Sequence, residues 1–138
     1  MFDFHIHTTV SFDGRDDAKA MLAAAEQAGL AEICFTDHID YTPELDMVFD
    51  TAVYRAAYDN LRSDKLLIRR GMEFGLTPDN RDRLKADLKR YDFDFVLGSV
   101  HMVQGLDVYL EPYWQGKTVE RAVELFLEQT LACVQVHE

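Results

Sequence analysis

The chain has 138 residues, of which 48% are hydrophobic and 28% charged, a composition typical of one globular domain rather than a disordered segment. Its formal net charge of -11, from 25 acidic and 14 basic side chains, argues against nucleic acid as a partner unless metal ions intervene. No apolar run approaches the roughly 20 residues that would span a membrane, and no signal peptide is visible. We therefore expect a cytoplasmic protein without a membrane partner.

Hydrophobic periodicity divides the chain into alternating strands and helices. The predicted strands cover residues 1–7, 31–36, 66–73 and 93–100, and the predicted helices cover residues 18–28, 51–62, 81–89 and 119–136. Asp16 and Asp17 offer an N-cap for the first helix, and Thr42-Pro43 marks a loop. The two cysteines lie within apolar runs, where we expect buried free thiols.

This alternation predicts an α/β fold with parallel strands and right-handed crossovers. We expect a partial (β/α) barrel of about four β/α units, roughly half of an eight-stranded barrel, which usually needs on the order of 250 residues. The chain is then an open half-barrel, a fragment, or one of two copies that complete each other. An open edge at the fourth strand would expose unpaired backbone groups, so we expect a homo-oligomer formed through that edge.

Residue types that bind metals gather where the predicted strands end. They are His5, His7, His38, Glu73 and His101. Because the carboxyl ends of parallel strands form the active face of α/β proteins, we interpret these residues as one site. His5 and His7 are two positions apart on a strand, so both imidazoles point to the same face. Imidazole and carboxylate ligands together suit zinc, manganese or iron.

Several of the candidate ligands also have a simpler, structural interpretation. The first two histidines could be partly exposed strand residues, and His38 could be a loop histidine held by Asp37. Asp13 lies in a Ser-Phe-Asp-Gly segment, and its spacing alone favours a turn former. Glu73 is harder to explain in this way, because a carboxylate at the end of an apolar strand is costly to bury unless it is paired or bound to metal.

The order of these motifs resembles the PHP (polymerase and histidinol phosphatase) superfamily. The motifs are His5-Ile6-His7, Asp13, Thr36-Asp37-His38, Gly71-Met72-Glu73-Phe74-Gly75 and Ser99-Val100-His101. The last two are most similar to the histidinol-phosphatase branch, and the resemblance covers essentially the whole chain. It implies a distorted seven-stranded β/α barrel, of which residues 1–138 would be a single PHP-like domain truncated at its C-terminus.

The resemblance also implies a site for up to three divalent ions, zinc, manganese or iron. The implied ligands are His5, His7 and Glu73 for the first ion, Glu73 and His101 for the second, and Asp13 and His38 for the third. This assignment reverses the turn-former interpretation of Asp13, and it gives Glu73 and His101 the catalytic role. The implied reaction is hydrolysis of a small phosphomonoester, histidinol phosphate, to histidinol and phosphate in histidine biosynthesis.

The chain departs from the family pattern in its C-terminal part. The family carries a further histidine on a later strand and an Asp-x-His motif, and neither is present here. We interpret His137 as an exposed terminal residue rather than the missing ligand. Arg15 and Lys117 would be weak substitutes for phosphate-binding residues, and we interpret them instead as a loop arginine and a helix-entry lysine. Two alternatives stay open: an inactive or partly metallated domain that acts by binding, and a phosphoesterase that acts on nucleotides.

Overall fold

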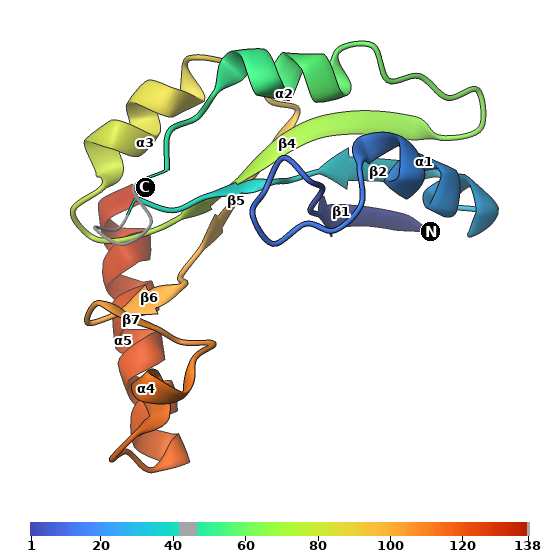
Figure 1. The fold of residues 1–138 in the computed structure, drawn as a ribbon. Helices are drawn as coiled ribbons and strands as arrows, with labels where there is room; N and C mark the ends of the chain where they lie inside the picture. Colours follow the sequence, from blue (N-terminus) through green and yellow to red (C-terminus); the bar gives the residue numbers. More distant parts are fainter. Residues whose placement is uncertain (42–46, 138) are drawn as a thin grey trace.

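A parallel sheet forms the centre of the computed structural model, which describes residues 1–41 and 47–137 (Figure 1). Its strands are β1 (Phe2–Ile6), β2 (Glu32–Phe35), β3 (His38–Ile39), β4 (Leu67–Gly75) and β5 (Phe95–Ser99). β1 pairs with β2, both β2 and β3 pair with β4, and β4 pairs with β5, always in parallel. The four predicted strands are therefore present, and β3 is an addition that the sequence did not predict.

Strand β4 lies at the centre of the sheet and pairs with three other strands. Its first half pairs with β2, and its second half pairs with both β3 and β5. Because a strand has only two edges, β3 and β5 lie on opposite sides of β4. The backbone N–H of Glu73 donates to the carbonyl of Asp37 at 3.1 Å, between β2 and β3. These two strands therefore follow one edge of β4, and the second places His38 directly beside Glu73.

Three helices cover one face of the sheet (Figure 1). They are α1 (Ala18–Gln27), α2 (Thr51–Tyr58) and α3 (Arg81–Leu88). α1 begins after Asp17, whose carboxylate accepts hydrogen bonds from two backbone N–H groups, and Asp50 caps α2 in the same way. The main core lies between these helices and the sheet, and it includes Ile6, Leu22, Ile33, Phe35, Tyr54, Tyr58, Met72, Phe74 and Leu84.

The opposite face of the sheet is concave. Phe4 on β1 contacts Phe95 on β5 with ring centres 5.2 Å apart, although the pairing order places other strands between them. In the described part of the chain β1 and β5 are both edge strands, so the sheet does not close into a barrel. The predicted α/β class and the parallel sheet are confirmed. The predicted barrel geometry is not confirmed, because the described sheet is open.

The segment between β5 and the last helix is more elaborate than the sequence predicted. Its elements are β6 (Met102–Val103), β7 (Leu106–Asp107), α4 (Glu111–Trp114) and α5 (Val119–His137). β6 and β7 form an antiparallel hairpin around Gln104 and Gly105, whose φ angles of 54° and 77° suit a tight two-residue turn. A second, small core joins this segment to α5 through Val103, Tyr113, Ala122 and Leu125.

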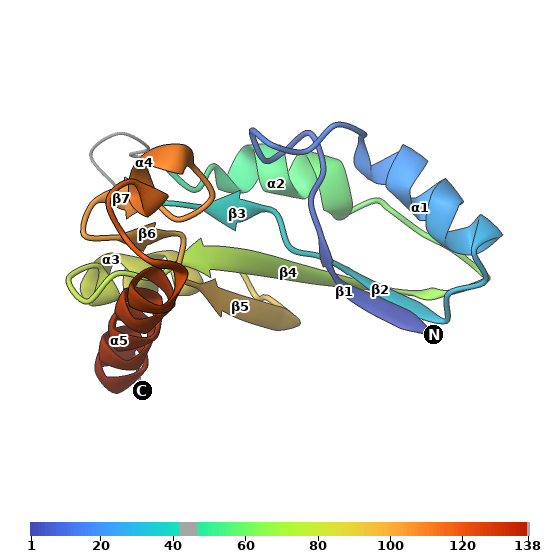
Figure 2. The same cartoon turned by 90° about the horizontal axis from the view of Figure 1, so that it is seen from below.

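Most of the periodic apolar residues of α5 are exposed. The predicted helix is confirmed, and it projects from the end of the sheet at which the strands terminate (Figures 1 and 2). The exposed fractions along it are Val119 65%, Val123 44%, Leu127 58%, Leu131 59% and Val134 50%. We call these five residues the α5 stripe. Periodicity thus predicted the helix correctly but did not predict what its apolar side contacts.

Three further expectations concern single features. Cys34 and Cys133 are buried and free, as predicted. Among the described helices, none is both long enough and apolar enough to cross a membrane. The loop expected at Thr42-Pro43 lies outside the described residues.

Candidate functional site

The polar residues singled out in the sequence meet at the carboxyl end of the sheet. His5 lies near the end of β1, His38 begins β3 and Glu73 lies in the second half of β4. His101 follows β5 by two residues. The parallel arrangement brings all these strand ends to one side of the sheet, which is where α/β proteins place their sites.

Glu73 is the centre of this cluster and is almost fully buried, with 2% of its surface exposed. One carboxylate oxygen lies 3.0 Å from His5 Nε2 and 2.8 Å from His7 Nε2, and the other lies 3.2 Å from His101 Nε2. Burial alone would raise the pKa of Glu73. Hydrogen bonds from His101, His7, Ser99 and His5 outweigh burial and hold this pKa well below its usual range.

A β-bulge in β1 contributes to this convergence. Between Asp3 and Ile6, β1 contains one more residue than the paired part of β2. A bulge of this kind redirects the side chains that follow it. The side chain of Phe4 therefore lies on the concave face of the sheet, where it contacts Phe95. The side chains of His5 and His7 both reach Glu73.

Asp13 belongs to the same cluster. Its carboxylate oxygens lie 2.9 Å from His7 Nδ1 and 3.3 Å from His38 Nε2. Burial tends to raise the pKa of Asp13, but the hydrogen bond to His7 and the charges of both histidines lower it below its usual value. Asp13 thus lies beside two potential ligands, as the family resemblance implied and as its spacing alone did not.

The loop that carries Asp13 is held by the buried carboxylate of Asp37, whose role differs from the one considered in the sequence. Asp37 accepts hydrogen bonds from Thr8 N at 2.6 Å, from Ser11 Oγ at 2.9 Å and from the hydroxyl of Tyr58. Ser11 Oγ in turn accepts a hydrogen bond from His38 N at 2.8 Å. Asp37 therefore orders the loop rather than holding the His38 ring, which was the simpler interpretation of that histidine.

Asp40 is a buried carboxylate that sequence reasoning missed. It is 4% exposed, and its two oxygens lie 2.9 Å from His38 Nδ1 and 2.9 Å from His101 Nδ1. Burial would raise the pKa of Asp40, yet hydrogen bonds to both histidines lower it to about 2. The signal was present in the sequence, because His38-Ile39-Asp40 repeats the spacing of His5-Ile6-His7 on a strand.

Three overlapping groups of these residues could each hold a metal ion. They are His5, His7 and Glu73; His7, Asp13 and His38; and His38, Asp40 and His101. Within each group the possible ligand atoms all lie within 4.8 Å of one another. Mixed imidazole and carboxylate ligands fit zinc and other first-row ions, so the residues present suit the predicted type of ion.

The carboxylates of the cluster shift the pKa values of the neighbouring histidines. The hydrogen bond to Glu73 is the largest influence on His7 and raises its pKa to about 9, against the opposing effect of burial. Asp40 and then Glu73 raise the pKa of His101 to about 10. Each carboxylate thus stabilises a positive charge beside it, and a divalent cation could replace those protons.

The other residues considered in the sequence have different roles. His137 is not simply an exposed terminal residue, because its Nε2 lies 2.9 Å from the carbonyl oxygen of Thr77. Lys117 donates to the carbonyl of Tyr113 and lies over its ring, 4.9 Å from the centre. It is therefore engaged within its own segment.

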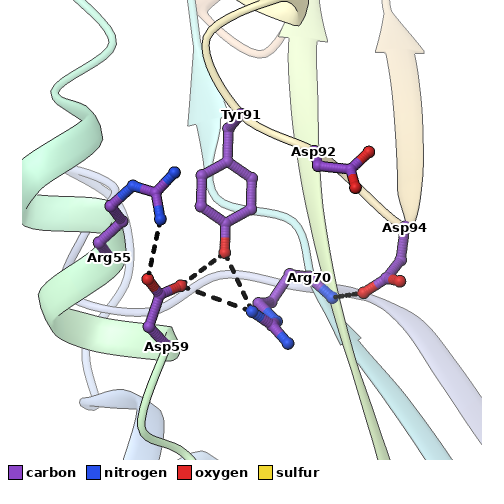
Figure 3. Close-up of a pocket in the computed structure, with 6 residues that line it drawn as sticks. All are labelled: Arg55, Asp59, Arg70, Tyr91, Asp92 and Asp94. Atoms are coloured by element: carbon purple, nitrogen blue, oxygen red, sulfur yellow. Dashed lines mark hydrogen bonds and ion pairs between the residues drawn. The ribbon is translucent and has the colours of Figure 1, made fainter.

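A pocket of about 250 Å³ lies away from this cluster (Figure 3). Its lining residues are Arg55, Asp59, Arg70, Tyr91, Asp92 and Asp94. Asp59 accepts a hydrogen bond from the Tyr91 hydroxyl at 2.7 Å and forms ion pairs with Arg55 and Arg70 at 3.1 and 3.5 Å. These contacts tie α2 to β4 near the start of β5, a region that contributes stability in folds of this kind.

The fold and the cluster together define an α/β protein with a candidate multinuclear metal site at the carboxyl end of a parallel sheet. The chain belongs to the PHP domain family, which matches residues 3–136. This match agrees with the resemblance seen in the sequence motifs.

Two curated relatives are similar in sequence. The chain is 34% identical over 140 residues to a probable histidinol-phosphatase of Clostridium acetobutylicum, covering 100% of this chain and 54% of that protein. It is 33% identical to a histidinol-phosphatase of Lactococcus lactis, covering 97% of this chain and 51% of the relative. The chain thus spans about half the length of these curated relatives.

A solved structure is also similar. It is the crystal structure of histidinol phosphate phosphatase from Lactococcus lactis, complexed with zinc, L-histidinol and phosphate. The TM-score is 0.84 at 30% identity, with 97% of this chain and 53% of that chain covered. The described fold is therefore similar to that of about half of the Lactococcus lactis structure.

Proposed function

We propose that this chain provides the greater part of the metal site of a phosphoesterase that hydrolyses histidinol phosphate to histidinol and phosphate. The observation that carries the proposal is the position of Glu73, a buried carboxylate shared by three imidazoles from β1 and from the end of β5. The similar Lactococcus structure, which contains zinc, L-histidinol and phosphate, supports both the type of ion and the substrate. The curved sheet would then be one part of a PHP barrel.

The proposed ligands are those that the family resemblance implies, and they coincide only in part with the three groups of the cluster. His5, His7 and Glu73 would hold one ion, Glu73 and His101 a second, and Asp13 and His38 a third, and the ions would be zinc, manganese or iron. Bound divalent ions supply Lewis acidity that stabilises negative charge on phosphoryl oxygens. They would also offset the acidic side chains of the cluster, which could not otherwise accept a phosphate dianion.

The residues of the chain position these groups. Glu73 contacts the histidines of β1 and His101 at once, so it would fix the spacing of two ions. The loop held by Asp37 brings Asp13 over the site, and the second core fixes the hairpin that follows His101. Glu73 and His101 are accordingly the proposed catalytic pair, because both would touch the ions that contact the substrate.

A phosphate-release assay tests this proposal. The chain is freed of metal with a chelator, supplied with zinc or manganese, and given histidinol phosphate and a panel of nucleoside monophosphates. We expect metal-dependent phosphate release from histidinol phosphate and its loss in Glu73→Gln, with Glu124→Gln on the exposed surface of α5 as the matched control. No release by a chain that binds metal would favour a binding domain, and preference for a nucleotide would change the substrate class.

We further propose that two copies of the chain associate through their open edges. β1 and β5 are edge strands in the described sheet, Phe2 is 72% exposed, and Val96 on β5 is 39% exposed. The α5 stripe adds further exposed apolar surface. Exposed edges and apolar patches of this kind commonly pair with another chain. Light scattering that finds only a monomer at tens of micromolar would exclude this association.

A further inference from the structure

We propose that Asp40 is a positioning residue that sets the tautomers of both His38 and His101 and so couples two of the metal positions. This inference rests on the proposed metal binding. One buried carboxylate contacts both rings, with Oδ2 2.9 Å from His38 Nδ1 and Oδ1 2.9 Å from His101 Nδ1. None of the sequence motifs includes Asp40.

The hydrogen-bonding capacity of a carboxylate determines where the protons lie in these two contacts. An ionised carboxylate only accepts hydrogen bonds, so the Nδ1 atom of each ring must carry the proton in these contacts. In a neutral imidazole the other nitrogen, Nε2, then keeps its lone pair. Asp40 therefore leaves both histidines with Nε2 free to bind a metal.

The Nε2 atoms point toward the rest of the cluster. His38 Nε2 lies 3.3 Å from Asp13, and His101 Nε2 lies 3.2 Å from Glu73. The two rings are close to each other, with centres 5.3 Å apart and planes at 78°. One carboxylate thus aims two rings in two directions, toward the proposed third and second ions. Such carboxylate–histidine–metal arrangements fix ring orientation and increase the basicity of the ligand.

The structure makes room for the Asp40 carboxylate and holds its backbone in place. A Cβ atom added at Gly75 would lie 1.8 Å from Asp40 Oδ1, so glycine at the end of β4 makes room for the carboxylate. The backbone of Asp40 is fixed as well, since its carbonyl accepts a hydrogen bond from Met47 N at 3.1 Å. The final glycine of the Gly-Met-Glu-Phe-Gly motif therefore has a physical reason in this chain.

Direct metal ligation by Asp40 is the competing role. His38, Asp40 and His101 form one of the groups that could hold an ion, and ligation there would use the Nδ1 side of the rings. Nitrogen NMR of the zinc-loaded chain, with ¹⁵N-labelled histidine, separates the two roles. We expect zinc on Nε2 and a proton on Nδ1 for both rings, and zinc on Nδ1 of either ring would overturn the proposal.

Asp40→Asn provides the second test. An amide of the same size offers one acceptor and one donor group, so it can serve one ring as Asp40 does but must donate to the other. That second ring is forced into the tautomer with a proton on Nε2 and loses its ability to bind metal there. We expect one zinc equivalent to bind about 10- to 100-fold more weakly, the usual cost of losing such a partner, and one histidine to change its NMR tautomer.

Two further variants make the outcome decisive. Asp87→Asn also alters a buried carboxylate, one that accepts from Tyr41, and it should leave zinc stoichiometry and the histidine tautomers unchanged. Gly75→Ala should displace the Asp40 carboxylate without any change of charge and weaken zinc binding in the same way. Failure of the unaltered chain to bind zinc would refute the metal proposal, whereas normal zinc affinity and tautomers in Asp40→Asn would refute the role of Asp40 alone.

Discussion

Replacing Glu73 by glutamine should destabilise the metal-free chain by an amount that depends on pH. Glu73 is 2% exposed and lies 2.8 Å from His7 and 3.2 Å from His101. Hydrogen bonds to charged groups contribute about 1.5–3 kcal/mol each. Glutamine keeps the size of the side chain and one acceptor oxygen. The contact of Glu73 with His5 adds little to the free energy of unfolding, because His5 is half exposed. We therefore expect Glu73→Gln to lower the free energy of unfolding by about 2–4 kcal/mol near pH 6.

The direction of the pH dependence follows from the pKa shifts. The pKa of His7 is raised from 6.5 to about 9, so its contribution is complete below pH 6.5 and is lost as pH rises through about 9. The pKa of Glu73 is lowered from 4.5, so its contribution is complete above pH 4.5 and is lost only in strong acid. The two contributions are together greatest between pH 4.5 and 6.5.

Urea unfolding in a chelating buffer measures this effect. Both chains are unfolded at pH 6 and again at pH 10, and the difference in free energy should be smaller at pH 10. Glu124→Gln is the control, because Glu124 is 60% exposed and its ion pair should contribute almost nothing. A difference between wild type and Glu73→Gln that is the same at both pH values would refute the coupling of Glu73 to the histidines.

Other predictions test the rest of the molecule. His7 and His101, with pKa values of about 9 and about 10, should release protons when zinc binds at pH 7, and equal calorimetric heats in buffers of different ionisation enthalpy would contradict this. Gly14→Ala places a Cβ atom 1.8 Å from a backbone oxygen of the Asp13 loop and should weaken zinc binding as well as stability. Gly29→Ala has open space but a φ of +69°, so it should cost only about 1 kcal/mol in stability and leave zinc binding unchanged. Leu131→Glu, at a position 59% exposed, should change stability by less than about 0.5 kcal/mol yet reduce self-association measured by light scattering.

Local sequence features predicted most of the secondary structure correctly. The Asp17 cap, the apolar alternation of the strands and the helical periodicity of α5 are each set by residues close together in the sequence, so they can be identified without the fold. The hairpin of β6 and β7 was missed because each strand is only two residues long. The α5 stripe shows the limit of periodicity, which detects an apolar face but not the surface that covers it.

The sequence by itself determined which groups this protein offers as possible metal ligands. Histidine and glutamate at successive strand ends carry their own donor atoms and their own spacing, and both are properties of the chain rather than of its packing. They sufficed to indicate a metal site, and their order sufficed to indicate the family.

The tertiary structure alone decided how these groups are connected. Asp40 and His101 are separated by 61 residues, and Glu73 and His5 by 68, so their contacts depend on the pairing of β3, β4 and β5 and on the bulge in β1. A carboxylate acquires its role from the two or three groups that its oxygens reach, and that geometry is a property of the folded sheet. The same carboxylate in the unfolded chain would be an ordinary acidic residue.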